Sequence, residues 1–280
     1  MAIHKPSELM AFLESLGIQP KKVLSQNFLV DGNIIRKIVK TANVSPADVV
    51  LEIGPGPGSL TEGLLEGGAH VIAVEKDNVL AGALERLKTD TNQLDIYCED
   101  ILEFPIAEVL KKNLKDGQKA KVIANLPYHL TTPILIKLVQ MQDIISSLVL
   151  MVQQEVGQRF TAIPGNHHYG SLTVFLNFYS KLKYGFTVSK QCFYPKPKVE
   201  SAIVILELKE PPFVADQEKF FQMTRTSFEH RRKMMRSSLR ELYPPETIME
   251  ALSKIGKNPQ SRPEELSLDE FLSLFAILNK

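Results

Sequence analysis

Alternating strand-like and helix-like segments between residues 49 and 209 constrain the fold of this chain more than any other feature. Short apolar runs rich in β-branched residues recur there, and the first four are separated by stretches long enough for a helix. This spacing is typical of βαβ units, so it predicts an α/β fold with a mostly parallel sheet. We expect strands at Val49–Ile53, Val71–Glu75, Leu94–Cys98, Lys121–Asn125, Ser147–Val152, Tyr184–Val188 and Ala202–Leu208.

The last two predicted strands are joined by a segment that is too short for a right-handed helical crossover. This segment contains the loop Phe193–Pro197. We therefore expect the two strands to form an antiparallel pair at the edge of the sheet.

The pattern changes at Pro211-Pro212, beyond which helical periodicity continues without strands. Asp216–Leu242, Pro245–Ile255 and Ser267–Leu278 are predicted helices, and the last has acidic residues in its first turn, where they suit the helix dipole. We predict that residues 1–209 form the sheet domain and that residues 210–280 form a small all-helical domain.

Composition narrows the class of protein. The 280 residues include only two cysteines, Cys98 and Cys192, which excludes a disulfide framework and a cysteine-rich zinc site, and we expect no metal. The chain has no apolar run long enough for a transmembrane helix and begins with a poor signal peptide, so we expect a cytoplasmic protein. Residues 181–240 hold 13 Lys and Arg against 6 Asp and Glu, which suggests a polyanionic partner or an ordinary solvated surface.

A glycine-rich turn, residues 54–58, follows the first strand and precedes a predicted helix. Such a turn lets a ligand approach the backbone closely. Ser59 stands where a dinucleotide fingerprint has its third glycine, and no phosphate-binding lysine follows, so a P-loop is excluded. Glu75 ends the second predicted strand and Asp100 follows the third, where they could bind ribose hydroxyls and an adenine amine. Together these features predict a nucleoside-shaped crevice at the carboxyl ends of adjacent strands.

The element Asn125-Leu126-Pro127-Tyr128 ends the fourth predicted strand. Proline frees neighbouring carbonyls from the sheet ladder, so the Asn125 side chain and a backbone carbonyl, which we assign to Pro127, could both accept from one exocyclic amine. Tyr128 offers a flat face on which a base could stack. The element therefore predicts a site that orients an amine toward an electrophile.

Over nearly its whole length, the chain resembles the rRNA adenine dimethyltransferase family of the KsgA/RsmA type. The shared motifs include Gln26-Asn27-Phe28-Leu29, residues 52–61, Glu75, Glu99-Asp100, Asn125-Leu126-Pro127-Tyr128, residues 193–202 and Phe228-x-x-Arg231-Arg232-Lys233. Their order and spacing make the resemblance specific, whereas the glycine turn alone would indicate only a nucleotide or S-adenosylmethionine.

The resemblance implies a Rossmann-like, S-adenosylmethionine-dependent methyltransferase domain followed by a small helical domain. It implies that Asn27 and Leu29 flank the cofactor, Gly54 contacts its amino-acid end, Glu75 binds the ribose, Asp100 binds the adenine amine, and Asn125 lies where cofactor and target meet. The family's substrates are two adjacent adenosines in a hairpin loop near the 3′ end of 16S rRNA, each dimethylated on its exocyclic amine. We thus expect a small-subunit assembly intermediate as the partner and a role in ribosome biogenesis.

The target base must leave its stack to reach the cofactor, and Tyr128 and Phe193 could stack on its two faces. Basic residues of one predicted helix could bind RNA phosphates, or form a solvated helix face. Arg225, Arg232, Arg236 and Arg240 would share one side of this helix, which also carries Arg231 and Lys233, and Lys196 and Lys198 add charge beside the loop of Phe193.

Three alternatives remain open. An NAD-dependent oxidoreductase conflicts with Ser59 and with the element at 125–128. A non-catalytic ribosome-assembly or nucleic-acid-binding factor on the same fold would not need the intact candidate site. A resistance-type methyltransferase acting on large-subunit rRNA shares the core motifs, although the Pro195–Lys198 loop and the Arg231-Arg232-Lys233 cluster resemble the 16S type. Nothing in the sequence indicates an oligomer or an obligate protein partner, so we expect a monomer.

Overall fold

The computed structural model describes residues 3, 5–18, 27–89, 93–127, 130–230 and 233–279, which form two compact units. The sheet unit comprises Met1–Gly157 and Lys183–Lys209, and the helical unit comprises Gln158–Leu182 and Glu210–Lys280. The second entry of the chain into the helical unit coincides with the boundary predicted near residue 210. Residues 158–182, which the sequence pattern places in the first domain, group instead with the C-terminal helices.

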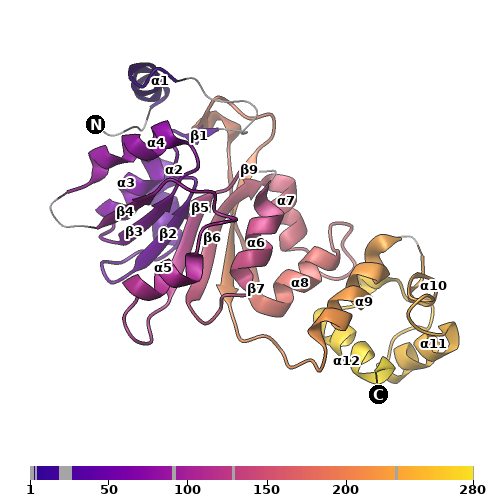
Figure 1. The fold of residues 1–280 in the computed structure, drawn as a ribbon. Helices are drawn as coiled ribbons and strands as arrows, with labels where there is room; N and C mark the ends of the chain where they lie inside the picture. Colours follow the sequence, from indigo (N-terminus) through magenta and orange to yellow (C-terminus); the bar gives the residue numbers. More distant parts are fainter. Residues whose placement is uncertain are drawn as a thin grey trace. The chain divides into compact units, whose positions relative to one another are not determined.

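A seven-stranded sheet with the order β4-β3-β2-β5-β6-β9-β7 forms the centre of the sheet unit (Figure 1). The neighbouring strands from β4 to β6 run parallel, and β9 runs antiparallel to β6. Their bounds are β2 (Val49–Ile53), β3 (His70–Val74), β4 (Leu94–Tyr97), β5 (Ala120–Asn125), β6 (Ile145–Gln153), β7 (Ser180–Val188) and β9 (Ser201–Leu208). The predicted α/β fold is confirmed, and β7 and β9 are neighbours with β7 at the edge.

Helices connect the strands and bury their apolar faces against the sheet. Ile35, Ile38, Leu60 and Leu64 are almost fully buried in one cluster with residues of β2 and β3. Burying a side chain of this size stabilises the fold by roughly 1.5–3 kcal/mol. The bounds are α1 (Pro6–Ser15), α2 (Gly32–Thr41), α3 (Ser59–Glu66), α4 (Asn78–Ala83), η2 (Leu84–Leu87), α5 (Ile106–Asn113), α6 (Thr131–Val139), α7 (Gln154–Phe160) and η4 (Lys190–Cys192). A separate two-stranded sheet pairs β1 (Phe28–Leu29) with β8 (Phe193–Tyr194).

The register of the parallel strands aligns their carboxyl ends. Ile53 pairs with Val74, and Val74 pairs with Tyr97, so the loops after β2, β3 and β4 begin side by side. Leu51 of β2 pairs with Val122 of β5, and the same register continued along the strands places Asn125 next to Gly54. This alignment brings residues from distant parts of the sequence to one edge of the sheet.

Aromatic packing holds the helical unit together. The Phe175 and Phe221 rings lie 5.0 Å apart, and Phe220 lies 5.6 Å from both Phe178 and Phe275, measured between ring centroids. These contacts join α8 to the C-terminal helices, which explains why residues 158–182 belong to this unit. Its elements are α8 (Ser171–Tyr179), α9 (Gln217–Glu229), α10 (Met235–Ser238), α11 (Pro245–Lys254), η5 (Pro263–Glu265) and α12 (Leu268–Leu278).

The prediction of one continuous helix over Asp216–Leu242 is wrong. α9 ends at Glu229, and His230 has non-helical backbone angles (φ −125°, ψ 74°). The chain restarts as α10, where the Met235 amide donates to the Ser261 carbonyl at 2.9 Å and the Met235 side chain is fully buried. Helical periodicity continues through this break, but tertiary contacts override it.

The last helix agrees with its prediction. Ser267 caps α12, with the Ser267 amide donating to Glu270 Oε2 at 2.8 Å, and Asp269 and Glu270 lie in the first turn. This arrangement satisfies amides at the helix start and places negative charge at the positive end of the helix dipole. Across the described ranges, no helix has both the length and the apolar character needed to cross a bilayer.

Candidate active site

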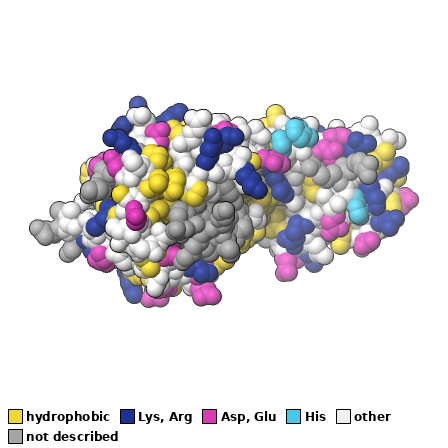
Figure 2. Space-filling view, turned by 90° about the horizontal axis from the view of Figure 1, so that it is seen from above, with side chains coloured by type: hydrophobic (Ala, Val, Ile, Leu, Met, Phe, Trp, Pro, Cys, Tyr) yellow, Lys and Arg dark blue, Asp and Glu magenta, His cyan; other side chains and the backbone are white. Residues whose placement is uncertain are grey.

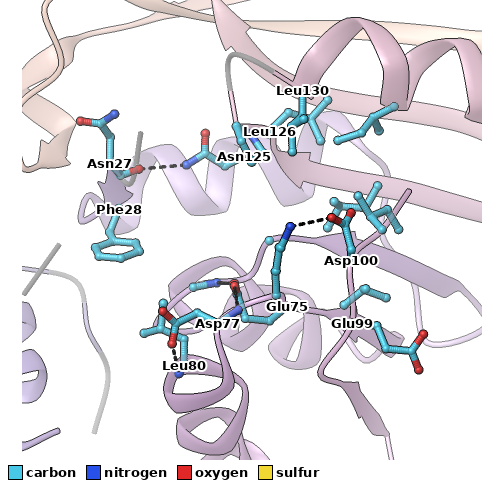
Figure 3. A pocket seen from close by; sticks show the side chains of 18 residues that line it. Asn27, Phe28, Glu75, Asp77, Leu80, Glu99, Asp100, Asn125, Leu126 and Leu130 are labelled. Atoms are coloured by element: carbon cyan, nitrogen blue, oxygen red, sulfur yellow. Dashed lines mark hydrogen bonds and ion pairs between the residues drawn. The ribbon is translucent and has the colours of Figure 1, made fainter. Parts of the chain in front are cut away.

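A cavity lies at the carboxyl ends of the parallel strands, where the loops after β2, β3, β4 and β5 meet (Figure 3). It belongs entirely to the sheet unit. Its lining includes six residues that the sequence singled out: Asn27, Gly54, Glu75, Asp100, Asn125 and Pro127. The structure therefore brings together residues from five separate motifs.

The glycine turn forms one wall of this cavity. Gly54 and Gly56 have positive φ angles of 65° and 57°, which favour glycine. Apart from Gly54 and its two chain neighbours, no described residue has a heavy atom within 4 Å of the point where a Gly54 Cβ would stand, whereas a Cβ on Gly56 would come within 2.9 Å of the Phe28 ring. The Gly54 backbone is thus open to a ligand, and the Gly56 backbone packs closely against β1.

Glu75 follows β3 and is held by backbone amides. Gly56 N donates to Oε2 and Asp77 N donates to Oε1, both at 2.9 Å. Burial raises the pKa of the Glu75 carboxyl, and these hydrogen bonds oppose that rise. Each oxygen of a carboxylate has two acceptor sites, so both oxygens of Glu75 can still accept from a ligand. Two hydroxyl groups of one ribose match this pair of acceptors.

Asp100 follows β4 and lies in the same cavity. Its Oδ1 accepts from Leu102 N at 2.9 Å, and its Oδ2 accepts from Lys76 Nζ at 2.7 Å (Figure 3). The hydrogen bond from Lys76 lowers the pKa of the Asp100 carboxyl, so this group is a carboxylate at neutral pH and an acceptor for an amine.

Asn125 ends β5, and its amide is oriented by the N-terminal segment. Its Nδ2 donates to the Asn27 carbonyl at 3.1 Å (Figure 3). Because a carbonyl can only accept, the atom that bonds it must be the side-chain nitrogen of Asn125 rather than the oxygen. Asn125 Oδ1 accepts no hydrogen bond from the described residues. Asn125 therefore keeps its acceptor oxygen for a ligand amine.

The backbone carbonyls of Leu126 and Pro127, which follow Asn125, differ in whether they already accept hydrogen bonds. The Pro127 carbonyl accepts from Leu130 N at 3.0 Å and from Thr131 Oγ1 at 3.3 Å, so it serves the start of α6. The Leu126 carbonyl has no donor among the described residues, and Leu126 also lines the cavity. The geometry thus favours Leu126 over the Pro127 predicted from the sequence as the second acceptor. Tyr128 lies outside the described residues.

Two predicted residues lie away from the cavity lining. Leu29 pairs with Phe193 between β1 and β8, and the side chains are only 5% and 4% exposed in the core of the sheet unit. The position of Phe193 does not favour the predicted stacking on a target base. The expected role of Leu29 beside the cofactor stays a prediction.

Glu52 is a buried acid that the sequence places in a shared motif without indicating a role for it. It lies on β2 two residues before Gly54, is 1% exposed, and its Oε2 has no hydrogen-bond partner in the described part of the chain. Burial raises the pKa of Glu52 to about 8, and repulsion from Glu75 adds to this. The nearby Thr61 hydroxyl offsets part of the rise, although its oxygen forms no hydrogen bond of good geometry. Glu52 is therefore largely a neutral acid at pH 7.

Sequence reasoning also missed part of the cavity lining. Lys76, Asp77, Leu80, Leu130 and Ile134 all line it. Lys76 and Asp77 directly follow Glu75, and this position could have suggested that they line the cavity. However, nothing in the sequence shows which neighbours of a motif face a ligand.

The predicted basic residues are divided between the two units. Lys196 and Lys198 are exposed in the sheet unit, whereas Arg225, Lys233 and Arg240 are exposed in the helical unit. Arg236 is half-buried, with Nη1 3.5 Å from Met249 Sδ. Arg231 and Arg232 lie outside the described residues. Because α9 and α10 are separate, the predicted stripe on one helix does not exist, and Figure 2 shows the basic side chains of this unit interspersed with acidic ones.

Comparison with known proteins gives full-length matches. The family model "Ribosomal RNA adenine dimethylase" matches residues 17–280. "Ribosomal RNA small subunit methyltransferase A" of Protochlamydia amoebophila is 62% identical over 275 residues, covering 98% of this chain and 97% of that protein. The protein of the same name from Chlamydia trachomatis serovar D is 45% identical over 281 residues, covering 99% of both.

Two solved structures are similar over most of the chain, each at 25% identity. A dimethyladenosine transferase from Plasmodium falciparum has a TM-score of 0.72 and covers 88% of this chain and 95% of its own. The 23S rRNA methyltransferase ErmE has a TM-score of 0.69 and covers 91% of this chain and 100% of its own.

Proposed function

Because the chain belongs to the ribosomal RNA adenine dimethylase family, we propose that its cavity binds S-adenosylmethionine and receives adenosines of 16S rRNA. The protein is an rRNA adenine dimethyltransferase of the small-subunit type. The finer assignment is to two adjacent adenosines in a hairpin loop near the 3′ end, within a small-subunit assembly intermediate. The convergence of the glycine turn, Glu75, Asp100 and Asn125 in one cavity carries this proposal.

The residues of the cavity fit S-adenosylmethionine. The open backbone at Gly54 suits its amino-acid end, the amide-held carboxylate of Glu75 suits the ribose hydroxyls, and the ionised Asp100 suits the adenine amine. When bound, this cofactor supplies an activated methyl group on its sulfonium. The protein therefore needs no covalent intermediate and no nucleophilic side chain.

Asn125 has the central role in catalysis. The lone pair of an adenine amine is delocalised into the ring, so the amine is a poor nucleophile. Two acceptors, Asn125 Oδ1 and the Leu126 carbonyl, would direct the two N–H bonds and turn the lone pair toward the methyl group. They would also stabilise the positive charge that develops on the nitrogen. We retain Tyr128 as the proposed stacking partner of the flipped base.

The proposed RNA contacts include Lys233, Arg236 and Arg240. Changing Arg236 and Arg240 to glutamine should weaken binding of the rRNA substrate, because up to two phosphate contacts are lost. The salt dependence of binding should flatten by up to about 0.7–0.9 log units for each lost contact. Filter binding over a salt series measures both quantities, and cofactor affinity should be unchanged.

A matched control removes two other basic charges of the helical unit. The double change Lys219→Gln and Lys254→Gln has the same effect on net charge but lies outside residues 225–240. An equal loss of affinity and slope in both double variants would mean that only the overall charge matters, and the contacts would be withdrawn.

The proposed function as a whole is tested by transfer of labelled methyl groups from S-adenosylmethionine to small subunits that lack the modification. We expect label on two adjacent adenosines near the 3′ end of 16S rRNA. The structural similarity to a 23S rRNA methyltransferase supplies the competing outcome, because label confined to 23S rRNA would overturn the small-subunit assignment.

A further inference from the structure

Lys137 lies on α6, and three backbone carbonyls of a single turn surround its ammonium group. Nζ donates to the carbonyl oxygens of Ile101, Leu102 and Phe104 at 3.1, 2.8 and 3.1 Å. A lysine ammonium has three N–H donors, so these bonds use its full capacity. Lys137 is not among the residues that line the cavity.

The turn that Lys137 binds is the turn that begins at Asp100. The Asp100 carbonyl accepts from Glu103 N at 2.9 Å and from Phe104 N at 2.8 Å, while Leu102 N donates to Asp100 Oδ1. These bonds fix the amides of the turn. Lys137, which lies on α6, donates to the carbonyls of the same turn. Hydrogen bonds from a charged donor are about twice as strong as neutral ones, so Lys137 gives this backbone strong support from outside the turn.

The same helix also contacts the segment that carries Asn125. At its first turn, Leu130 N and Thr131 Oγ1 donate to the Pro127 carbonyl, and Leu130 and Ile134 line the cavity. Lys137 follows Ile134 by three residues, about one helical turn. Helix α6 thus contacts both the turn of Asp100 and the element at 125–127.

We propose that Lys137 is a positioning residue for cofactor recognition, which holds the turn of Asp100 in place relative to Asn125. This inference rests on the proposed binding of S-adenosylmethionine. The other lysine near Asp100, Lys76, bonds the carboxylate alone, and its side chain is 67% exposed. Lys76 therefore does not supply the backbone support that Lys137 gives.

The variant Lys137→Met keeps the aliphatic chain and removes the ammonium. We expect the dissociation constant of S-adenosylmethionine, measured by calorimetry, to rise about tenfold, because Asp100 no longer presents its acceptor to the adenine. The turnover number at saturating cofactor should change little, since Asn125 remains in place. The amides of Leu102, Glu103 and Phe104 should exchange hydrogen faster in the ligand-free variant.

Base selectivity separates a positioning role from a merely stabilising one. Wild-type protein should bind S-adenosylhomocysteine more tightly than S-inosylhomocysteine. In the second compound an oxygen replaces the adenine amine, which would donate a hydrogen bond to Asp100. In Lys137→Met this preference should shrink. Lys137→Arg should restore part of it, because guanidinium can donate to the carbonyls but lacks the compact charge of an ammonium.

Lys119→Met is the matched control, because Lys119 Nζ also donates to a backbone carbonyl, that of Gln142 at 2.6 Å, but does not line the cavity. It should leave affinity and selectivity unchanged. If Lys137→Met lowers only thermal stability and retains the wild-type affinity and selectivity, Lys137 has no positioning role. Failure of the wild-type protein to bind S-adenosylmethionine would instead overturn the proposed function itself.

Discussion

Replacing Asn125 with alanine is expected to lower the single-turnover rate of methyl transfer about a hundredfold, since one well-placed acceptor contributes on the order of 3 kcal/mol in a transition state. The change removes Oδ1, which accepts from the target amine, and also Nδ2, which bonds the Asn27 carbonyl. Binding of rRNA should survive, because the proposed phosphate contacts involve other residues. Rapid-quench measurements at saturating cofactor and rRNA check this result.

A control for the loss of an asparagine amide is Asn113→Ala. Asn113 Nδ2 also donates to a backbone carbonyl, that of Val109 at 3.0 Å, but Asn113 ends α5 and does not line the cavity. Its single-turnover rate should equal that of the wild type. A normal rate in Asn125→Ala under the same conditions would remove Asn125 from the catalytic machinery.

Replacing Glu52 with glutamine is expected to stabilise the folded protein at alkaline pH. The pKa of Glu52 is raised from its ordinary value of 4.5 to about 8 in the folded protein. Below pH 4.5 the group is protonated in both states and has no effect. As the pH rises toward 8, the unfolded chain releases the proton while the folded protein retains it, so the free energy of unfolding falls. Above pH 8 the free energy of unfolding stays lower by a constant amount, roughly 5 kcal/mol.

Glutamine cannot ionise, so the Glu52→Gln variant should lack this part of the pH dependence. Denaturant titrations at pH 5, 7 and 9 measure it, and the trend with pH is the readout because any packing cost of glutamine is the same throughout. Glu75→Gln must be measured in parallel, since burial raises the pKa of Glu75 in the same direction. Glu108→Gln, on the surface of α5, serves as a control and should follow the wild type. A wild-type pH trend in Glu52→Gln would show that Glu52 is ionised in the folded protein.

Most of the sheet could be predicted from the sequence because β2, β3, β5, β6 and β9 are short runs of mostly buried residues with their own boundary signals. β2 has the predicted bounds Val49–Ile53, and all five of its residues are buried. The helical unit was harder to predict. Residues 158–182 belong to this unit because of aromatic contacts between α8 and α9, which lie far apart in the sequence. The break after Glu229 depends on contacts of Met235. Periodicity reports which residues are apolar, but it does not report which distant residue covers them.

The candidate site shows the same division between local and long-range information. Gly54, Glu75, Asp100 and Asn125 were predictable because each lies at or just after the end of a strand, and parallel strands end at one edge of a sheet. The choice between the carbonyls of Leu126 and Pro127 was not predictable, because it depends on the way α6 begins. The burial of Phe193 was also hidden, since it follows from pairing between β1 and β8, which lie far apart in the sequence.

The insertion of β9 between β6 and β7 has a consequence for synthesis of the chain. β7 is made before β9. Among the described strands its one neighbour in the sheet is β9, so the backbone of β7 cannot be paired until residues 201–208 have been made. The aromatic side chains of α8 likewise lack their partners until α9 has been made. The nascent chain thus carries two incomplete units at once, and residues 201–229 supply the first partners of both. Until then, the unpaired backbone of β7 is exposed to aggregation.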